Sequence, residues 1–180
     1  WGAYGLGKVR AENAALQLRP DSYILRPPYL YGPGQNLYRE PFVFDCARQA
    51  RPFCLPGQGE MPLHSCHMDD LCRLIHILIT RQPESRILNV GDAAPVTVRR
   101  WVEMCYQAAG AEPPRFISVG AEHAQRAYFP FHPYGYVLDV TKQLALLDTL
   151  TPLQEGLRQS FAWYIHNENA VPKRDYLAYI

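Results

Sequence analysis

The chain has 180 residues, 48% of them hydrophobic, and its formal net charge is +1. A chain of this length can bury a substantial core within one compact domain. The near-neutral charge, with no basic run, argues against nucleic acid as a partner, and the lack of an apolar run of about 18 residues argues against a membrane span.

Short apolar runs alternate with amphipathic segments, which is typical of an α/β protein. The pattern predicts a helix from about Tyr4 to Leu18, ended by a proline. A short buried strand is expected over residues 22–28, and the Gly-Pro and Pro-Gly steps of residues 29–36 predict a turn. The next expected elements are a helix over residues 42–51, a strand over 52–55 and a turn over 56–59.

The middle of the chain repeats this alternation. A helix is predicted over residues 67–81, where Asp69 and Asp70 suit the first turn because the helix dipole favours negative charge there. Strands are expected over residues 86–91 and 115–119, and Thr97 is expected to cap a helix between them. The helix over residues 67–81 carries an apolar stripe formed by Leu71, Leu74, Ile75, Leu78 and Ile79.

Two further helices are predicted from their caps. Asp139 is expected to cap a helix that runs to about Leu147. Thr151 is expected to cap the last helix, with Pro152 at the first helical position and Gln154 as the capping-box partner.

The cysteines are five in number and show no CxxC pair. An odd, unpatterned set is typical of reduced thiols in a cytoplasmic protein, most of them acting as small core residues. The chain opens on tryptophan, so we expect it to be a piece of a longer protein. The cysteines are Cys46, Cys54, Cys66, Cys72 and Cys105.

The opening stretch WGAYGLGKVRAENAALQL places Tyr4 and Lys8 four residues apart, which puts both side chains on one helical face. A phenol has a pKa of about 10, and bringing it near neutrality takes roughly 4 kcal/mol. An ammonium about 5 Å away supplies on the order of 3 kcal/mol at an effective dielectric of about 20. An oxidised nicotinamide ring would complete the shift. The pair makes chemical sense as a general acid–base for hydride transfer, and the alternative is an exposed tyrosine and lysine on an ordinary helix.

Gly5 and Gly7 lie in the same predicted helix, where each costs roughly 1 kcal/mol relative to alanine. A cofactor lying across this face would leave no room for side chains at these positions. Together with Gly2 they spell GxxGxG, but a dinucleotide fingerprint follows a strand and opens a helix. We therefore reject this pattern as a fingerprint, and no G-x-G-x-x-G occurs elsewhere in the chain.

Several motifs occur in a recognisable order: YGLGKVRAE, ILRPPYLYGPG, HMDDL, LNVG and, after Asp139, TPLQEGLRQSFAWY. In this order and spacing the chain resembles the extended short-chain dehydrogenase/reductases, the family of NAD(P)-dependent nucleotide-sugar epimerases and dehydratases. The resemblance implies an α/β fold: the remainder of a Rossmann-type parallel sheet plus the smaller α/β substrate-binding domain, with the N-terminal Rossmann half absent. Residues 1–30 would be the last helix and strand of the Rossmann domain, and residues 31–180 the substrate-binding region with interleaved returns to the sheet.

The resemblance also implies roles for individual residues. Tyr4 resembles the catalytic base, and Lys8 the residue that holds the nicotinamide ribose and lowers the tyrosine pKa. Pro27 and Pro28 resemble a stretch whose backbone faces the nicotinamide. The implied cofactor is NAD or NADP, and most of its binding site belongs to the absent half, so we expect the 180-residue chain alone to be inactive. No metal is expected.

Further positions match family motifs that are largely structural. Asp70 resembles an aspartate that organises the substrate loop, and Asn89 and Gly91 resemble a turn after a strand. The aromatic, proline-rich stretch YFPFHPYGY over residues 128–136 is expected to pack as a loop, and the alternative hypothesis is that it lines the substrate cleft.

The substrate positions depart from the family pattern. Tyr29 stands where sugar epimerases often carry asparagine, and arginines that grip a nucleotide diphosphate are usual near Leu63 and shortly before Asp139. Each lost arginine contact is worth about 1.5–3 kcal/mol. Arg39 or Arg126 would have to compensate. We expect a sugar-like or nucleotide-sugar-like substrate, with Tyr29 and Arg39 as substrate residues.

Two functions from different classes stay open at this point. The first is an NAD(P)-dependent epimerase, dehydratase or reductase that uses Tyr4 and Lys8. The alternative is an atypical, non-catalytic family member that binds RNA or a protein partner. The strand over residues 22–28 would have an uncovered face, so we expect association with a separate N-terminal piece or through the exposed face. A homodimer built on the tyrosine helix is also expected.

Overall fold

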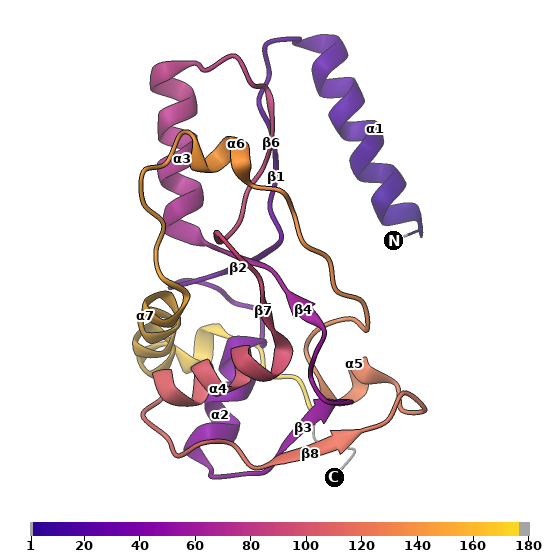
Figure 1. Ribbon diagram of the computed structural model, residues 1–180, viewed down its shortest axis with the longest axis vertical. Coiled ribbons are helices and arrows are strands. Elements are labelled where there is room, and N and C mark those ends of the chain that lie inside the picture. The colour runs from indigo at the N-terminus through magenta and orange to yellow at the C-terminus, as the bar shows by residue number, and fades with distance from the viewer. Residues whose placement is uncertain (1, 177–180) are drawn as a thin grey trace.

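The computed structural model describes residues 2–176, so residue 1 and residues 177–180 of the predicted domain ranges lie outside it. It is a mixed α/β structure whose strands form four short pairs (Figure 1), which confirms the predicted fold class. The helices are α1 (Gly2–Leu18), α2 (Glu40–Arg48), α3 (Met68–Arg81), α4 (Val98–Ala108), α5 (Gln125–Tyr128), α6 (Thr141–Leu144), α7 (Leu153–His166) and the 3-10 helix η1 (Glu168–Ala170). The strands are β1 (Ile24–Arg26), β2 (Tyr29–Tyr31), β3 (Phe53–Pro56), β4 (Pro62–Leu63), β5 (Ser65–His67), β6 (Ile87–Asn89), β7 (Val96–Thr97) and β8 (Phe116–Val119).

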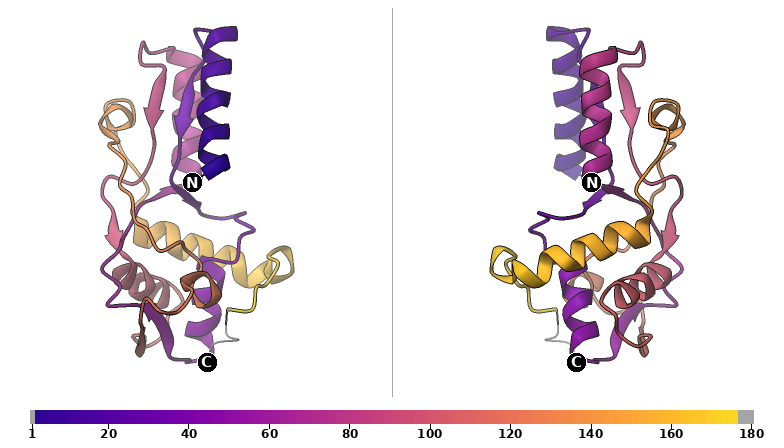
Figure 2. Two further views of the ribbon diagram at one scale, coloured as in Figure 1. Left: turned by 90° about the vertical axis from the view of Figure 1, so that its right-hand side faces the viewer. Right: turned by 90° about the vertical axis from the view of Figure 1, so that its left-hand side faces the viewer.

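Three of the strand pairs are parallel and one is antiparallel. β1 pairs with β6, β2 with β5 and β3 with β8 in parallel, whereas β4 runs antiparallel to β7. Parallel pairs need crossover connections, and helices supply most of them here. The view of Figure 1 shows α1 on one side of the β1–β6 pair and α3 on the other, and the side views of Figure 2 agree. This part of the molecule is therefore a helix–sheet–helix sandwich.

The larger hydrophobic core lies in the half of the molecule built from α2, β3, α4, β8 and α7, which we call the packed lobe. Its side chains are mostly aromatic, and rings meet edge to face: Trp101 lies 5.1 Å from Phe131 and Phe44 lies 5.2 Å from Phe161, centroid to centroid. The fully buried side chains here include Tyr31, Phe44, Phe53, Leu55, Trp101, Phe129, Phe131, Leu157 and Tyr164.

The remaining part, built from α1, β1, α3 and β6, has a smaller core and is called the open region below. Its buried side chains come from α3, β6 and neighbouring segments, and none comes from α1. Two of the five residues in the predicted apolar stripe on α3, Leu74 and Leu78, are buried, while Ile79 stays 68% exposed. The buried side chains of this core are Cys66, Leu74, Leu78, Leu88, Val90 and Leu147.

Helix α7 fits closely against the β2–β5 pair because of one glycine. A Cβ atom at Gly156 would lie 2.7 Å from a ring carbon of Tyr31 and 2.8 Å from Cδ2 of His67. Such distances are impossible without displacement of buried rings, so a side chain at this position would separate α7 from the strands.

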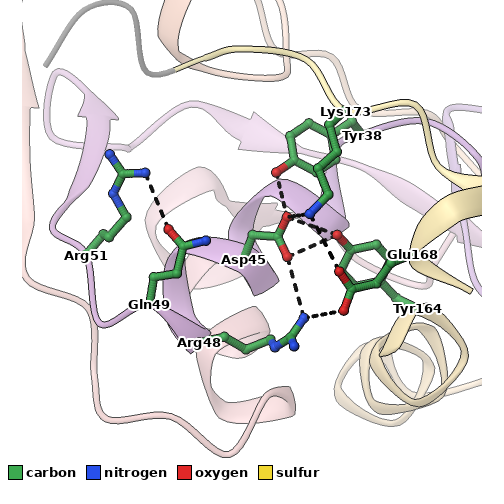
Figure 3. Close-up of polar contacts among 8 residues, drawn as sticks. All are labelled: Tyr38, Asp45, Arg48, Gln49, Arg51, Tyr164, Glu168 and Lys173. Atoms are coloured by element: carbon green, nitrogen blue, oxygen red, sulfur yellow. Dashed lines mark hydrogen bonds and ion pairs between the residues drawn. The ribbon is translucent and has the colours of Figure 1, made fainter. Parts of the chain in front are cut away.

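A polar network fastens the C-terminal segment to α2 (Figure 3). The hydroxyls of Tyr38 and Tyr164 both donate to the Asp45 carboxylate, at 2.7 and 2.9 Å. The Lys173 ammonium lies 3.0 Å from the same carboxylate, and Glu168 bridges to Arg48 at 2.7 Å. Burial and the Asp45 hydrogen bond raise the pKa of the Tyr164 hydroxyl above its usual range. Because the Asp45 charge is well partnered, the network stabilises the packed lobe.

Local signals predicted several elements correctly. The helix predicted over residues 67–81 and the helix capped by Thr97 are both present, and the Thr97 hydroxyl oxygen accepts from the Arg100 N–H at 3.2 Å. The predicted turn over residues 29–36 is wrong at its start, because residues 29–31 form β2 beside β5. The helix after Asp139 ends at Leu144 rather than Leu147, although the Asp139 carboxylate does accept from the Thr141 N–H at 2.9 Å.

The predicted capping box of the last helix is also wrong. The cap position of α7 is Pro152, which makes no side-chain cap hydrogen bond. Thr151 instead donates its N–H and its hydroxyl to the carboxylate of Asp70, both at 2.8 Å, and Gln154 donates to the carbonyl of Met104. A tertiary carboxylate therefore replaces the local partner that the sequence pattern indicated.

Candidate active site

Helix α1 presents three polar side chains on one face, Tyr4, Lys8 and Glu12, at successive i, i+4 spacings. The Lys8 ammonium nitrogen lies 5.4 Å from the centroid of the Tyr4 ring, within the range of a cation–π contact. Tyr4 is 63% exposed. The structure thus brings the predicted pair together on an accessible face.

Glu12 ties this face to the end of β1. The Arg26 guanidinium donates to the Glu12 carboxylate through Nε at 2.9 Å and through Nη2 at 2.5 Å. This bidentate contact lowers the pKa of Glu12 and raises that of Arg26, since each charge favours its partner's ionised form. The pair orients α1 relative to β1 and the prolines that follow it.

A cavity of about 840 Å³ opens between α1, the end of β1 and a loop before α6. Both members of the predicted catalytic pair line it, and so do the prolines predicted to face the nicotinamide. Its volume lies in the usual range for small-molecule sites. The lining residues are Tyr4, Gly5, Lys8, Glu12, Leu25, Arg26, Pro27, Pro28, Tyr29, His132, Tyr134 and Tyr136.

Aromatic rings form the wall of the cavity opposite α1. Tyr29 packs against Phe131 at 4.6 Å and against Tyr136 at 5.8 Å between ring centroids, and His132 stacks on Tyr134 at 5.3 Å. Burial is the main cause that raises the pKa of Tyr136, to about 12. His132, Tyr134 and Tyr136 of the YFPFHPYGY stretch line this cavity, and the hypothesis that the stretch lines a substrate cleft stays a prediction.

The two predicted substrate residues lie in different places. Tyr29 lines the cavity, whereas Arg39 is buried and is not among the lining residues. The Arg39 guanidinium lies 5.5 Å from the Tyr29 ring and donates to the carbonyl of Leu30 at 2.5 Å. Arg39 therefore supports the aromatic wall from behind.

Gly5 and Gly7 of α1 differ in whether they line the cavity. Gly5 lines the cavity, as expected if a ligand lies across this face, but Gly7 does not, and a Cβ atom there would meet nothing within 4 Å. The cavity therefore gives a reason for Gly5 alone.

Asp70, Asn89 and Gly91, which were expected to have structural roles, make contacts that hold segments of the chain together. Asp70 is buried and joins α3 to the start of α7 through Thr151. The side-chain amide of Asn89 donates to the carbonyl of Asp139 at 3.1 Å, and the backbone of Gly91 exchanges two hydrogen bonds with the Gln143 amide at 2.7 and 2.8 Å. These contacts hold the segment around α6 against β6.

Sequence reasoning missed Glu12, Arg26 and Asp92. Glu12 continues the i, i+4 series of Tyr4 and Lys8, so helical spacing could have indicated it. Asp92 is buried, accepts from the Ser65 hydroxyl at 2.6 Å, and has its other oxygen without a partner among the described residues. Burial is the main cause that raises its pKa to about 7. Asp92 does not line the cavity, so we treat it as a stability feature.

Over residues 2–176, no three His, Cys, Asp or Glu side chains cluster in a way that could hold a metal ion. Within the same residues, no helix has the length and apolar character that a membrane crossing needs.

Parallel strands flanked by α1 and α3, with a cavity at the end of β1, define a Rossmann-type α/β structure. Comparison with solved structures shows which proteins share this fold. A dTDP-glucose 4,6-dehydratase from Bacillus anthracis str. Ames, solved with NAD, superposes with a TM-score of 0.73 at 20% identity over 95% of this chain and 54% of that chain. MoeE5, solved with UDP-glucuronic acid and NAD, gives 0.65 at 25% identity over 91% of this chain and 55% of that one.

A UDP-glucuronic acid 4-epimerase from Bacillus cereus, solved with NAD, gives a TM-score of 0.65 at 16% identity over 96% of this chain and 53% of that one. The fold is therefore that of NAD-dependent epimerases and dehydratases, and the resemblance seen in the sequence motifs is confirmed. The chain spans about half the length of these structures.

Among curated proteins, the chloroplast stem-loop binding protein of 41 kDa b from Arabidopsis thaliana is 24% identical over 161 residues, which is 86% of this chain and 43% of that protein. No family model matches the chain.

Proposed function

We propose that the chain is the catalytic C-terminal part of an NAD(P)-dependent epimerase, dehydratase or reductase that acts on a sugar-like alcohol. The observation that carries this proposal is the shared cavity of Tyr4 and Lys8, whose ammonium lies 5.4 Å from the Tyr4 ring. The fold shared with NAD-bound dehydratase and epimerase structures supports it. Because the chain spans about half of those structures, a Rossmann half from outside the described residues would have to supply the rest of the site.

The residues of the cavity fit the nicotinamide ribose end of such a cofactor. The Lys8 ammonium and the Tyr4 hydroxyl are hydrogen-bond donors that suit ribose hydroxyls, and Gly5 leaves that face without a side chain. Pro27 and Pro28 carry no backbone N–H, so a flat apolar ring can lie against them. No G-x-G-x-x-G turn for the cofactor phosphates occurs in the sequence, so this chain would hold only that end.

When bound, the nicotinamide would accept a hydride from the substrate carbinol carbon and return it. The Tyr4 oxygen would take the hydroxyl proton as the carbonyl forms and give it back when the carbonyl is reduced. The positive charge of Lys8 would stabilise the negative charge that develops on the Tyr4 oxygen during the transfer. The aromatic wall would keep water from the reacting carbon.

The proposal is tested by removing the Tyr4 hydroxyl. The chain is fused behind the Rossmann half of MoeE5, and turnover of UDP-glucose is followed by product analysis. We expect Tyr4→Phe to lower turnover by about 10²–10⁴-fold, because proton transfer loses its acid–base. The control is Tyr23→Phe, which removes a hydroxyl that donates to the carbonyl of Pro83 at 2.7 Å and is not among the cavity residues. Equal turnover by the two variants would refute the proposal.

A second candidate function is binding of structured RNA. The curated relative is named for stem-loop binding, and that observation favours it. The net charge of +1 provides little attraction for phosphates. The test is fluorescence anisotropy with an RNA hairpin over a salt series: affinity that falls steeply with salt supports this function, and no retention at about 50 mM salt excludes it.

Two further expectations become proposals on the same basis. Leu6 is 60% exposed and Val9 is 55% exposed on α1, and this apolar surface supports a homodimer built on that helix. All five cysteines are free thiols, which supports a reducing, cytoplasmic compartment.

A further inference from the structure

The aromatic wall of the cavity carries information about the substrate, provided that the proposed function holds. Tyr29, Tyr134 and Tyr136 line the cavity together with His132, so most of its surface opposite α1 is ring surface. The wall is held in place from behind: Phe131 packs on Tyr29 at 4.6 Å and on buried Trp101 at 5.1 Å. A wall supported by the core of the packed lobe offers a rigid surface for stacking.

The arginines nearest the wall each donate to a backbone carbonyl of the chain, and the Nε of Arg39 has no partner among the described residues. Arg39 is 9% exposed, and it donates to the carbonyl of Leu30 while its guanidinium lies over the rings of Tyr29 and Phe131. The guanidinium of Arg126 donates to the carbonyl of Pro130. Neither side chain is among the lining residues, so neither contacts a ligand in the cavity directly, although both charges act on the lining Tyr29 hydroxyl.

The cations that do line the cavity, among the residues the structure describes, are Lys8 and Arg26. Arg26 is neutralised by the bidentate contact with Glu12. Lys8 lies beside the Tyr4 ring, where the proposed chemistry needs it. A nucleoside diphosphate carries at least two negative charges, and its tight recognition uses several charge-assisted contacts. The described part of the cavity does not provide them.

We propose that the cavity recognises its substrate as an uncharged ring stacked against Tyr29, Tyr134 and Tyr136, with no clamp for a diphosphate. The substrate class is then a neutral cyclic polyol or glycoside that presents a hydroxyl to Tyr4. The specificity of the site would come from ring faces and hydroxyl groups, and anionic groups on the same ring would contribute little to affinity.

The test compares ligands that share one ring and differ in charge. Methyl glucoside, glucose 1-phosphate and UDP-glucose are titrated into the 180-residue chain, with binding followed by ligand-observed NMR. We expect the three dissociation constants to agree within about threefold and to be unchanged between about 50 and 300 mM salt. UDP-glucose affinity at least tenfold above that of methyl glucoside and falling with salt would overturn the proposal, as would no binding by methyl glucoside.

Variants separate the wall from the acid–base. Tyr136→Ala should weaken methyl glucoside binding about tenfold, while Tyr136→Phe, which keeps the ring, should stay within twofold. Equal losses in both variants would overturn the stacking role. Tyr23→Phe, which removes a hydroxyl outside the cavity, should leave methyl glucoside binding within about twofold of the unsubstituted chain. If methyl glucoside still binds but the Tyr4→Phe fusion stays active, only the proposed acid–base chemistry is refuted. If the chain prefers charged ligands, only the proposal of an uncharged ring stacked on the aromatic wall is refuted.

Discussion

The packed lobe and the open region are built from the same kinds of element, yet they differ in how much each helix buries. In the packed lobe, α4 buries six of its side chains against α2 and α7. In the open region, α1 is longer than α4 but has no buried residue. The side chains proposed for catalysis lie on α1 and the wall that faces them is held by the packed lobe. The difference indicates that one region supplies a rigid surface and the other an accessible reactive group.

The difference in packing between the two regions is tested most strongly by truncating one large side chain in each of them. Trp101→Ala removes a buried ring that packs on Phe131, so we expect a loss of about 3–5 kcal/mol in the free energy of unfolding. Leu18→Ala on α1 should change the same quantity by less than about 0.5 kcal/mol, since Leu18 is 80% exposed. Urea denaturation measures both. Comparable losses would show that α1 packs as tightly as α4.

Asp92 is buried beside the Ser65 hydroxyl, and its carboxyl group predicts a pH dependence of stability. Burial raises its pKa to about 7, so the folded state holds a proton that the unfolded state releases near pH 4. Stability from this group is therefore complete below about pH 4, falls as pH rises towards 7, and is at its lowest above that. The groups that bear on it are the Ser65 hydroxyl, Asp70 and Tyr31.

Asp92→Asn removes this titration and keeps an acceptor for the Ser65 hydroxyl. We expect the variant to be more stable than the unsubstituted chain by roughly 2–4 kcal/mol at pH 9 and equal to it at pH 4. Urea titrations at the two pH values provide the measurement. A constant difference between the proteins at both pH values would contradict a buried, protonated Asp92.

Two buried tyrosines of the packed lobe differ in whether their hydroxyl groups have a hydrogen-bond partner, and this difference predicts different effects on stability. The Tyr164 hydroxyl donates to Asp45, whereas the Tyr31 hydroxyl has no hydrogen-bond partner within residues 2–176. Tyr164→Phe should cost about 1.5–3 kcal/mol because a charged acceptor loses a donor, and Tyr31→Phe should be close to neutral. Thermal denaturation of the two variants decides the matter, and a larger loss for Tyr31→Phe would reveal a partner for that hydroxyl.

Much of the fold followed from local patterns in the sequence, but the short strands did not. The helix of residues 67–81 and the Thr97 cap were predictable because period, charge and cap agree within a few residues. β4 and β7 have two residues each, too few for any periodic signal, and they exist only because they pair with each other. The capping box at Thr151 failed because Asp70, far away in the sequence, is a stronger acceptor.

Some features of the candidate site could likewise be predicted from local sequence patterns, and others could not. Tyr4 and Lys8 could be predicted because four residues make one helical turn. The wall depends on tertiary packing, which brings residues 132–136 beside Tyr29, and no sequence spacing encodes that approach. The burial of Arg39 could not be predicted either, because the sequence does not indicate whether an arginine side chain faces a ligand or a backbone carbonyl.

The central claim is that the exposed face of α1 holds the nicotinamide ribose through Lys8. Hydrogen exchange of residues 2–18, measured with and without oxidised nicotinamide mononucleotide, tests it most directly. The account predicts slower exchange in α1 on addition of the ligand, retained in Lys142→Ala and lost in Lys8→Ala, with β3 unchanged throughout. No change in the unsubstituted chain, or the same change in Lys8→Ala, would contradict it.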